Sequence, residues 1–156
     1  GGLLVVLALG PVRDPLAAAV SGAMVGSTLG LLQWWALRPL GLSFDWAWAT
    51  AVALMVASPI SWAIVAYSTS VSALTIWGLI AGAIVGLAQT LSQRLPLKRV
   101  VSWSALVSGA WGLAWFISAN EIVDAEASYA VFGSTGALTA TALLALFVNP
   151  VLSRKK

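Results

Sequence analysis

The sequence predicts an all-α fold, a polytopic bundle of transmembrane helices, and three observations lead to this fold class. Hydrophobic residues make up 60% of the chain and charged residues only 8%, whereas a soluble domain carries roughly a quarter charged residues. The apolar residues form stretches close to the roughly 20 residues that a helix needs to cross a bilayer. Charged residues lie at the ends of these stretches. We therefore expect one transmembrane domain over residues 1–156.

The beginning of the chain predicts part of a span and then a complete one. Residues 1–12 are apolar but only about half as long as a span. We expect them to be the end of a clipped first span, and a cleaved signal peptide is the alternative. Residues 16–37 form the first complete span, which ends at Arg38-Pro39, a basic residue followed by a helix breaker.

The middle of the chain predicts three further spans, over residues 46–67, 71–91 and 100–119. Pro59 lies inside the first of these, where a kink is expected, with the neighbouring serines satisfying the freed backbone groups. The sequence between the second and third, residues 95–99, reads as a basic loop.

The last part predicts an acidic loop and a final span. Residues 120–128 contain three acids, and residues 129–148 form the fifth complete span. Asn149-Pro150 should stop this helix before a basic cytoplasmic tail over residues 149–156. Five complete spans and the clipped one make six.

A pattern of glycines occurs twice, 56 residues apart, and ends each time in a glutamine and an arginine. Small residues four apart share one face of a helix and let a neighbouring helix approach closely. We expect helix packing at the glycines of both copies: Gly22, Gly26, Gly30, Gly78, Gly82 and Gly86.

The two copies belong to two larger units, repeat one over residues 16–67 and repeat two over 71–119. Each unit pairs a glycine-bearing span with a span that begins near a tryptophan. An even number of crossings separates the copies, so they enter the membrane in the same direction. The repeats are therefore expected to be parallel, not inverted.

Gln33 and Gln89 lie at the ends of the two glycine faces. One hypothesis is a polar clasp, in which each amide hydrogen-bonds across a helix contact. The other is a ligand site formed by both glutamines together. Two uncharged amides discriminate poorly between ligands, so the clasp is the favoured interpretation.

Basic residues predict the orientation of the chain. With the C-terminal end cytoplasmic, seven of the eight lysines and arginines lie on that side and only Arg13 lies outside. This distribution places both termini in the cytoplasm. Contacts with lipid headgroups are expected at four of these residues: Arg38, Arg94, Lys98 and Arg99.

The composition argues against several classes of function. The chain has no cysteine and no histidine, and no charged residue lies between the ends of a predicted span. Proton relays and ion-coupled carriers usually need such a charge, and catalysis needs a nucleophile with a base, paired carboxylates or a metal. We expect no enzyme, no cofactor and no metal site, and the dispersed basic residues do not predict nucleic-acid binding.

Three functional hypotheses remain. The first is a non-catalytic accessory or scaffold subunit that packs against membrane lipid and a larger integral membrane protein complex. The second is a small passive channel or carrier for a neutral or lipid-like molecule. The third and weakest is carotenoid or quinone binding by the tryptophans.

The pattern Gly-x3-Gly-x3-Gly-x2-Gln-x4-Arg, followed by a span led by tryptophan, resembles that of small polytopic bacterial membrane proteins with no assigned activity. The similarity covers residues 22–62 and 78–115. It implies a multi-pass protein of the bacterial cytoplasmic (inner) membrane. The second copy departs from the first at Trp34-Trp35, which is replaced by Thr90-Leu91.

Overall fold

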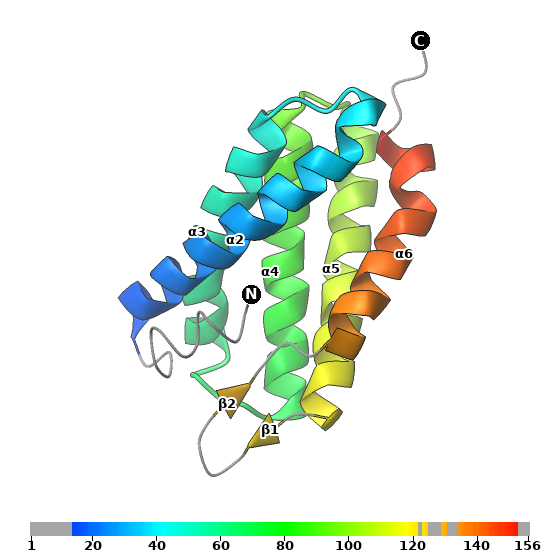
Figure 1. Ribbon diagram of the computed structural model, residues 1–156. Coiled ribbons are helices and arrows are strands. Elements are labelled where there is room, and N and C mark those ends of the chain that lie inside the picture. Colours follow the sequence, from blue (N-terminus) through cyan, green and yellow to red (C-terminus); the bar gives the residue numbers. More distant parts are fainter. Residues whose placement is uncertain (1–13, 122, 125–128, 131–133, 153–156) are drawn as a thin grey trace.

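A computed structural model describes residues 14–121, 123–124, 129–130 and 134–152 as a bundle of helices (Figure 1). The elements, in chain order, are α2 (Pro15–Leu37), the short 3-10 helix η1 (Arg38–Leu40), α3 (Asp45–Ile64), α4 (Val71–Ser92), α5 (Leu97–Glu121), the two-residue strands β1 (Val123–Asp124) and β2 (Tyr129–Ala130), and α6 (Ser134–Leu152). The strands pair antiparallel. The prediction of an all-α class with a helical bundle is confirmed, apart from this small hairpin.

The helices begin and end where local chemistry favours it. The Asp14 carboxylate accepts a hydrogen bond from the Ala17 N–H at 2.8 Å, and Pro15 occupies the first turn of α2. Ser70 caps α4 in the same way, accepting from the Ala73 N–H at 3.3 Å. Gly41, with φ at 79°, turns the chain after η1.

Consecutive helices pack against one another, α2 with α3, α3 with α4, α4 with α5 and α5 with α6. Figure 1 shows that the α2–α3 and α4–α5 connections and the C-terminal end of α6 lie at the same end of the bundle. The α3–α4 connection and the hairpin lie at the opposite end. We call the first end the basic end, because all described lysines and arginines lie there: Arg38, Arg94, Lys98 and Arg99.

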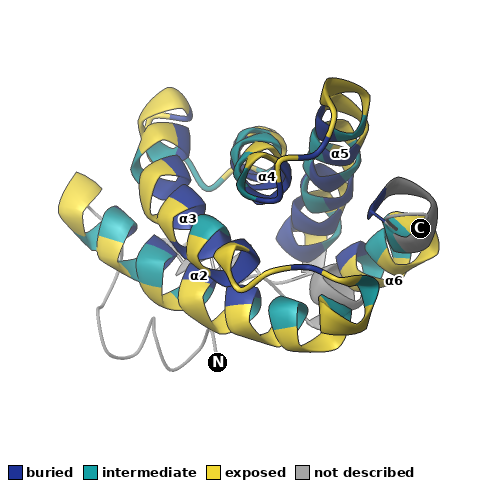
Figure 2. Ribbon diagram, turned by 90° about the horizontal axis from the view of Figure 1, so that it is seen from above, coloured by how far each residue is buried: buried dark blue, intermediate teal, exposed yellow. Residues whose placement is uncertain are grey.

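Buried residues gather where α3, α4 and α5 face one another, and the outer side of α2 consists mainly of exposed residues (Figure 2). The core contains many small side chains, including Ala57, Ala81 and Ala114, each with no exposed surface. Large apolar side chains point outward, among them Leu32, 60% exposed, and Ile64, 59% exposed. A surface of this kind needs lipid around it.

Four helices are long and apolar enough to cross a membrane, which confirms that this is a membrane protein: Pro15–Leu40, Asp45–Ile64, Val71–Ser92 and Leu97–Asn120. The described residues do not provide six such spans. In α6 (Ser134–Leu152) the apolar part that the structure describes in full is Thr139–Val148. Residues 1–12, where the clipped span is predicted, lie outside the described residues.

Several predicted boundaries were wrong. The last helix was predicted to begin at residue 129, but β2 lies there and α6 begins at Ser134. The helix predicted over residues 46–67 ends at Ile64. Helix α6 does not stop at Asn149-Pro150 but continues to Leu152, since a proline removes one backbone donor without preventing one more turn. Helix α5 begins at Leu97, so Lys98 and Arg99 belong to its first turn instead of a loop. The predicted acidic loop is partly structured, because α5 extends to Glu121 and β1 follows.

Pro59 lies inside α3, as the sequence indicates, and the helix continues to Ile64. The expectation that the neighbouring serines compensate is wrong for Ser61. Its hydroxyl is buried and has no hydrogen-bond partner among the described residues. This side chain faces the apolar contact with α4, because Ala57 and Val65, one turn away on either side, pack with Trp77 there.

A buried glutamine cluster as the candidate functional site

The three glycines of α2 lie where its backbone meets that of α3. All three are buried. A Cβ atom added at Gly26 would stand 2.9 Å from the Ala51 Cα, and one at Gly30 would stand 2.6 Å from the Ala47 carbonyl oxygen. An added Cβ at Gly22 would collide with the Leu54 carbonyl. Only glycine allows these backbones to come this close.

The glycines of α4 make the corresponding approach to α5. A Cβ at Gly82 would stand 2.7 Å from the Val107 carbonyl oxygen, and one at Gly86 would stand 2.7 Å from the Ser104 Cα. At Gly78 the nearest backbone atom would be the Trp111 carbonyl oxygen, at 2.7 Å. Trp111 therefore lies at the contact between α4 and α5.

The two helix pairs make these contacts at matching positions. Gly30 and Gly86 are 56 residues apart, and the residues they approach, Ala47 and Ser104, are 57 apart. The connection inside the second pair is thus one residue longer, while the order of contacts along the helices is the same.

The close approach of these helices brings Gln33 and Gln89 together. The Gln89 Nε2 donates to the Gln33 Oε1 at 3.0 Å and to the Thr50 Oγ1 at 3.0 Å. Thr50 in turn donates to the Trp46 carbonyl at 2.8 Å. Gln89 is only 1% exposed and Thr50 is fully buried. Helices α2, α3 and α4 are therefore joined by one set of hydrogen bonds inside the bundle.

Two tryptophans complete this set. The Trp46 Nε1 donates to the Gln33 Oε1 at 3.2 Å, and the Trp103 Nε1 donates to the Gln89 Oε1 at 2.9 Å. Their rings lie 5.9 Å apart, tilted by 58°. These contacts extend the set to α5, and we call the five residues the glutamine cluster: Gln33, Trp46, Thr50, Gln89 and Trp103.

The hydrogen bonds determine how each amide is oriented. The Gln33 oxygen accepts from two donors, Gln89 and Trp46, so its nitrogen cannot take that position. The Gln89 oxygen accepts from Trp103, while its nitrogen donates twice. Every polar atom of the Gln89 side chain is therefore paired with another residue of this chain.

A second polar contact lies beside the cluster at the basic end. The Gln93 Nε2 donates to the Ser43 Oγ at 3.0 Å, and the Ser43 N–H donates to the Gln93 Oε1 at 2.9 Å. This pair connects the end of α4 to the segment before α3. It holds the two connections at the basic end together.

The opposite end of the bundle contains a group of packed aromatic side chains. Trp77 and Trp115 pack edge to face with centroids 5.1 Å apart, and Trp62 lies 6.2 Å from both Trp77 and Tyr67. The Trp77 Nε1 is buried and has no hydrogen-bond partner in the described part of the chain. The glutamine cluster and the Gln93–Ser43 pair thus lie on the side of the bundle away from this aromatic group.

The four residues predicted to contact lipid headgroups all lie at the basic end. Arg38, Arg94 and Lys98 are exposed, and Arg99 is half-buried. The Arg38 guanidinium lies 5.7 Å from the centre of the Trp35 ring. Arg94 occupies a left-handed position, with φ at 52°, immediately after α4.

The sequence did not identify several residues of the glutamine cluster and of the neighbouring polar contact: Thr50, Trp46, Trp103, Ser43 and Gln93. Tryptophans of membrane helices often face the headgroups at the membrane boundary, but Trp46 is fully buried and Trp103 only 3% exposed. The sequence does contain a sign of these two contacts, because a tryptophan follows each glutamine at nearly the same distance. Trp46 follows Gln33 by 13 residues and Trp103 follows Gln89 by 14.

The chemistry available to the glutamine cluster is hydrogen bonding by neutral amide, hydroxyl and indole groups. Among the described residues there is no group of three His, Cys, Asp or Glu side chains that could hold a metal ion. The chain matches no protein-family model, and comparisons with curated proteins and with solved structures find no significant similarity.

Proposed function

We propose that this protein is a non-catalytic accessory or scaffold subunit of a membrane, which presents apolar helix faces to a larger integral membrane complex and to lipid. The observation that carries the proposal is the internal pairing of the glutamine cluster. A carrier must offer its polar groups to a substrate, whereas Gln89 directs all of its hydrogen bonds to Gln33, Thr50 and Trp103.

The exposed surface supports the same role. Helix α2 presents large apolar side chains away from the bundle, including Met24, 44% exposed, and Leu31, 47% exposed. Helix α3 adds Val52 and Ile60, which are 51% and 42% exposed. Surfaces of this kind pack against lipid or against other membrane helices.

We further propose that α2–α3 and α4–α5 are parallel internal repeats. The matching order of glycine contacts supports this, as does the pairing of each glutamine with a tryptophan of the following helix. In this proposal the glycines are packing positions and the two glutamines are a polar clasp that fastens one repeat to the other.

The proposed location is the bacterial cytoplasmic membrane, with the basic end toward the cytoplasm. The location rests on the sequence resemblance. The orientation is supported by four described basic residues at one end, accompanied there by the acidic Asp45, while Asp14 and Glu121 lie at the other.

The test is purification of the full chain from its native membrane in a mild detergent, followed by mass spectrometry of the proteins that accompany it. A scaffold subunit should bring one larger membrane protein with it in a fixed ratio. Emergence of the chain alone and monodisperse would refute the proposal.

The variant Gln33→Leu/Gln89→Leu separates a scaffold from a carrier. If the glutamines serve only as a clasp, the variant should be less stable but should still associate with the same partner at permissive temperature. Transport by the unmodified chain alone in liposomes, lost in this variant, would instead identify a carrier.

A further inference from the structure

We propose that the bundle carries one selective site for an anionic phospholipid at the basic end of the α2–α3 pair. The site consists of five residues that we call the aromatic edge: Trp34, Trp35, Arg38, Phe44 and Trp48. Arg38 would bind the lipid phosphate, and the exposed tryptophans would contact the glycerol and upper acyl region. This lipid site is independent of the proposed scaffold role.

The side chains of the aromatic edge form two contact groups, one of Trp34, Phe44 and Trp48 and one of Trp35 and Arg38. Trp34 and Phe44 pack edge to face with ring centroids 5.0 Å apart, and Phe44 and Trp48 do so at 6.4 Å. Helix α2 supplies Trp34, while Trp48 lies in the first turns of α3. The first group therefore spans both helices of the pair, and Trp34 and Trp35, adjacent in α2, place the two groups side by side in the sequence.

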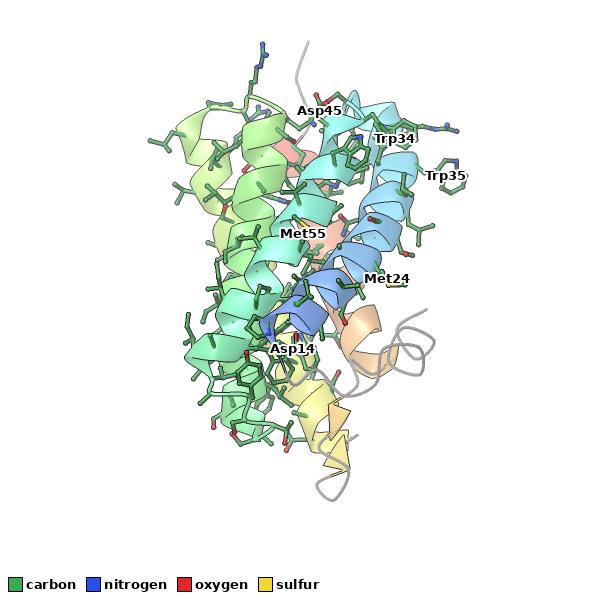
Figure 3. The ribbon with its side chains drawn as sticks, turned by 90° about the vertical axis from the view of Figure 1, so that its left-hand side faces the viewer. Asp14, Met24, Trp34, Trp35, Asp45 and Met55 are labelled. Atoms are coloured by element: carbon green, nitrogen blue, oxygen red, sulfur yellow. The ribbon has the colours of Figure 1, made fainter. Side chains whose placement is uncertain are left out.

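Two of these tryptophans remain available to a ligand. Trp35 is 62% exposed and Trp48 is 64% exposed, and Figure 3 shows Trp35 projecting away from the ribbon. An indole that is this exposed on a membrane helix places its ring at the headgroup level and its N–H toward water or a lipid ester. The aromatic edge thus has the chemistry of a lipid interface.

The charge of the aromatic edge selects the headgroup. Arg38 is exposed, and its guanidinium lies over the Trp35 ring, at 5.7 Å from the centroid. Such a cation–π contact orients the guanidinium beside the ring while its N–H groups remain free to bind phosphate oxygens. The nearby acid, Asp45, accepts a hydrogen bond from Ser43 at 3.0 Å. The described residues of the basic end carry four basic side chains, Arg38, Arg94, Lys98 and Arg99, against this one acid, and such a positive end favours an anionic lipid over a zwitterionic one.

The acyl chains would continue along α2. Leu31 and Leu32 precede the tryptophans by one turn and are 47% and 60% exposed. They lie on the membrane side of Trp35, because α2 runs toward the basic end. The apolar surface and the cation are therefore in the order in which a phospholipid presents its chains and phosphate.

The α4–α5 pair provides an internal comparison. It has Arg94 at the position of Arg38, but Thr90 and Leu91 stand where α2 has Trp34 and Trp35. Thr90 is fully buried and donates to the Gly86 carbonyl, so this edge has a cation without the aromatic group. The site should therefore be single, not duplicated.

The experiment is native mass spectrometry of the full chain, released from nanodiscs that contain equal amounts of phosphatidylglycerol and phosphatidylcholine. The unmodified chain should retain one phosphatidylglycerol in preference to phosphatidylcholine. Arg38→Gln should lower its occupancy about fivefold or more, the effect of losing one basic residue near a lipid headgroup. Arg94→Gln, the matched control, should retain the lipid.

A second variant keeps the proposal testable if Arg38→Gln does not fold. Trp35→Leu makes this position like its counterpart Leu91 and changes a side chain that is mostly exposed, so its helical circular dichroism and elution volume should not change. It should also lose the retained lipid. Equal retention of both lipids by the unmodified chain, equal losses in Arg38→Gln and Arg94→Gln, or full retention by a folded Trp35→Leu would each overturn the proposal.

Discussion

Single residues decide how closely the helices can approach one another. Gly26 faces the backbone of α3 at Thr50 and Ala51, where an added Cβ would be 2.9 Å from the nearest atoms. Gly109 is also inside a helix, but an added Cβ there would meet no atom within 4 Å. The same substitution should therefore have opposite effects at these two positions.

We predict that Gly26→Ala lowers the stability of the bundle by about 1–3 kcal/mol, since α2 and α3 must separate to make room. Gly109→Ala should leave the stability unchanged or raise it by up to about 1 kcal/mol, because alanine favours a helix more than glycine does. Thermal unfolding in detergent, followed by circular dichroism, measures both. Equal destabilisation by the two variants would contradict the close contact at Gly26.

The glutamine cluster joins the helices, and its two amides do not contribute equally to the stability of the bundle. Gln89 makes three hydrogen bonds and is buried, whereas Gln33 accepts two and is half-buried. Loss of Gln89 also leaves the Trp103 N–H without its acceptor inside the bundle. An unpaired buried group costs more than the hydrogen bond it formed.

Gln89→Leu should therefore destabilise the bundle more than Gln33→Leu, and the double variant should be less harmful than the sum of the two. The coupling energy expected for such a pair inside a membrane is about 0.6–1.7 kcal/mol. A double-mutant cycle of unfolding free energies in detergent measures it. Strict additivity would show that the Gln89–Gln33 hydrogen bond is absent in the protein.

At the scale of the helices, the sequence predicted which face of α2 and of α4 packs against another helix, but not which helix each face contacts. The four-residue spacing of the glycines was enough to place Gln33 and Gln89 near packed surfaces. Their meeting depends on how α2 and α4 are arranged around α3, which local patterns do not encode. Tryptophan is common near the headgroups, yet Trp46 is completely buried and donates a hydrogen bond to Gln33.

For the whole molecule, the distribution of charge predicts a single orientation in the membrane. The basic end carries Arg38, Arg94, Lys98 and Arg99, and the connection between α3 and α4 lies at the opposite end (Figure 1). The sequence contains no cysteine, so single cysteines can be introduced without a background signal.

We predict that Leu97→Cys, at a residue 76% exposed at the basic end, is protected in intact cells from a maleimide that cannot cross membranes. Tyr67→Cys, in the connection at the other end, should be labelled under the same conditions. Lysed cells, in which both cysteines should react, are the control. The reverse pattern would invert the proposed orientation.

The uneven placement of polar pairs along the bundle has a consequence for its motions. At the basic end the Gln93–Ser43 contact and the glutamine cluster connect α2, α3, α4 and α5. Of the three buried side-chain groups without a partner in the described part of the chain, the Ser61 hydroxyl and the Trp77 N–H lie toward the other end, and the Ser104 hydroxyl lies beside Trp103. Opening fluctuations should therefore start at the other end.

Hydrogen–deuterium exchange in nanodiscs should thus show amides near Ser61 and Trp77 exchanging faster than those near Thr50 and Gln89, although all four belong to membrane-spanning helices. Gln89→Leu should reduce this difference by loosening the slow end. The bundle would then behave as a group of helices fastened at the basic end and free to spread at the other, which lets one surface adapt to a partner while the opposite end keeps its shape.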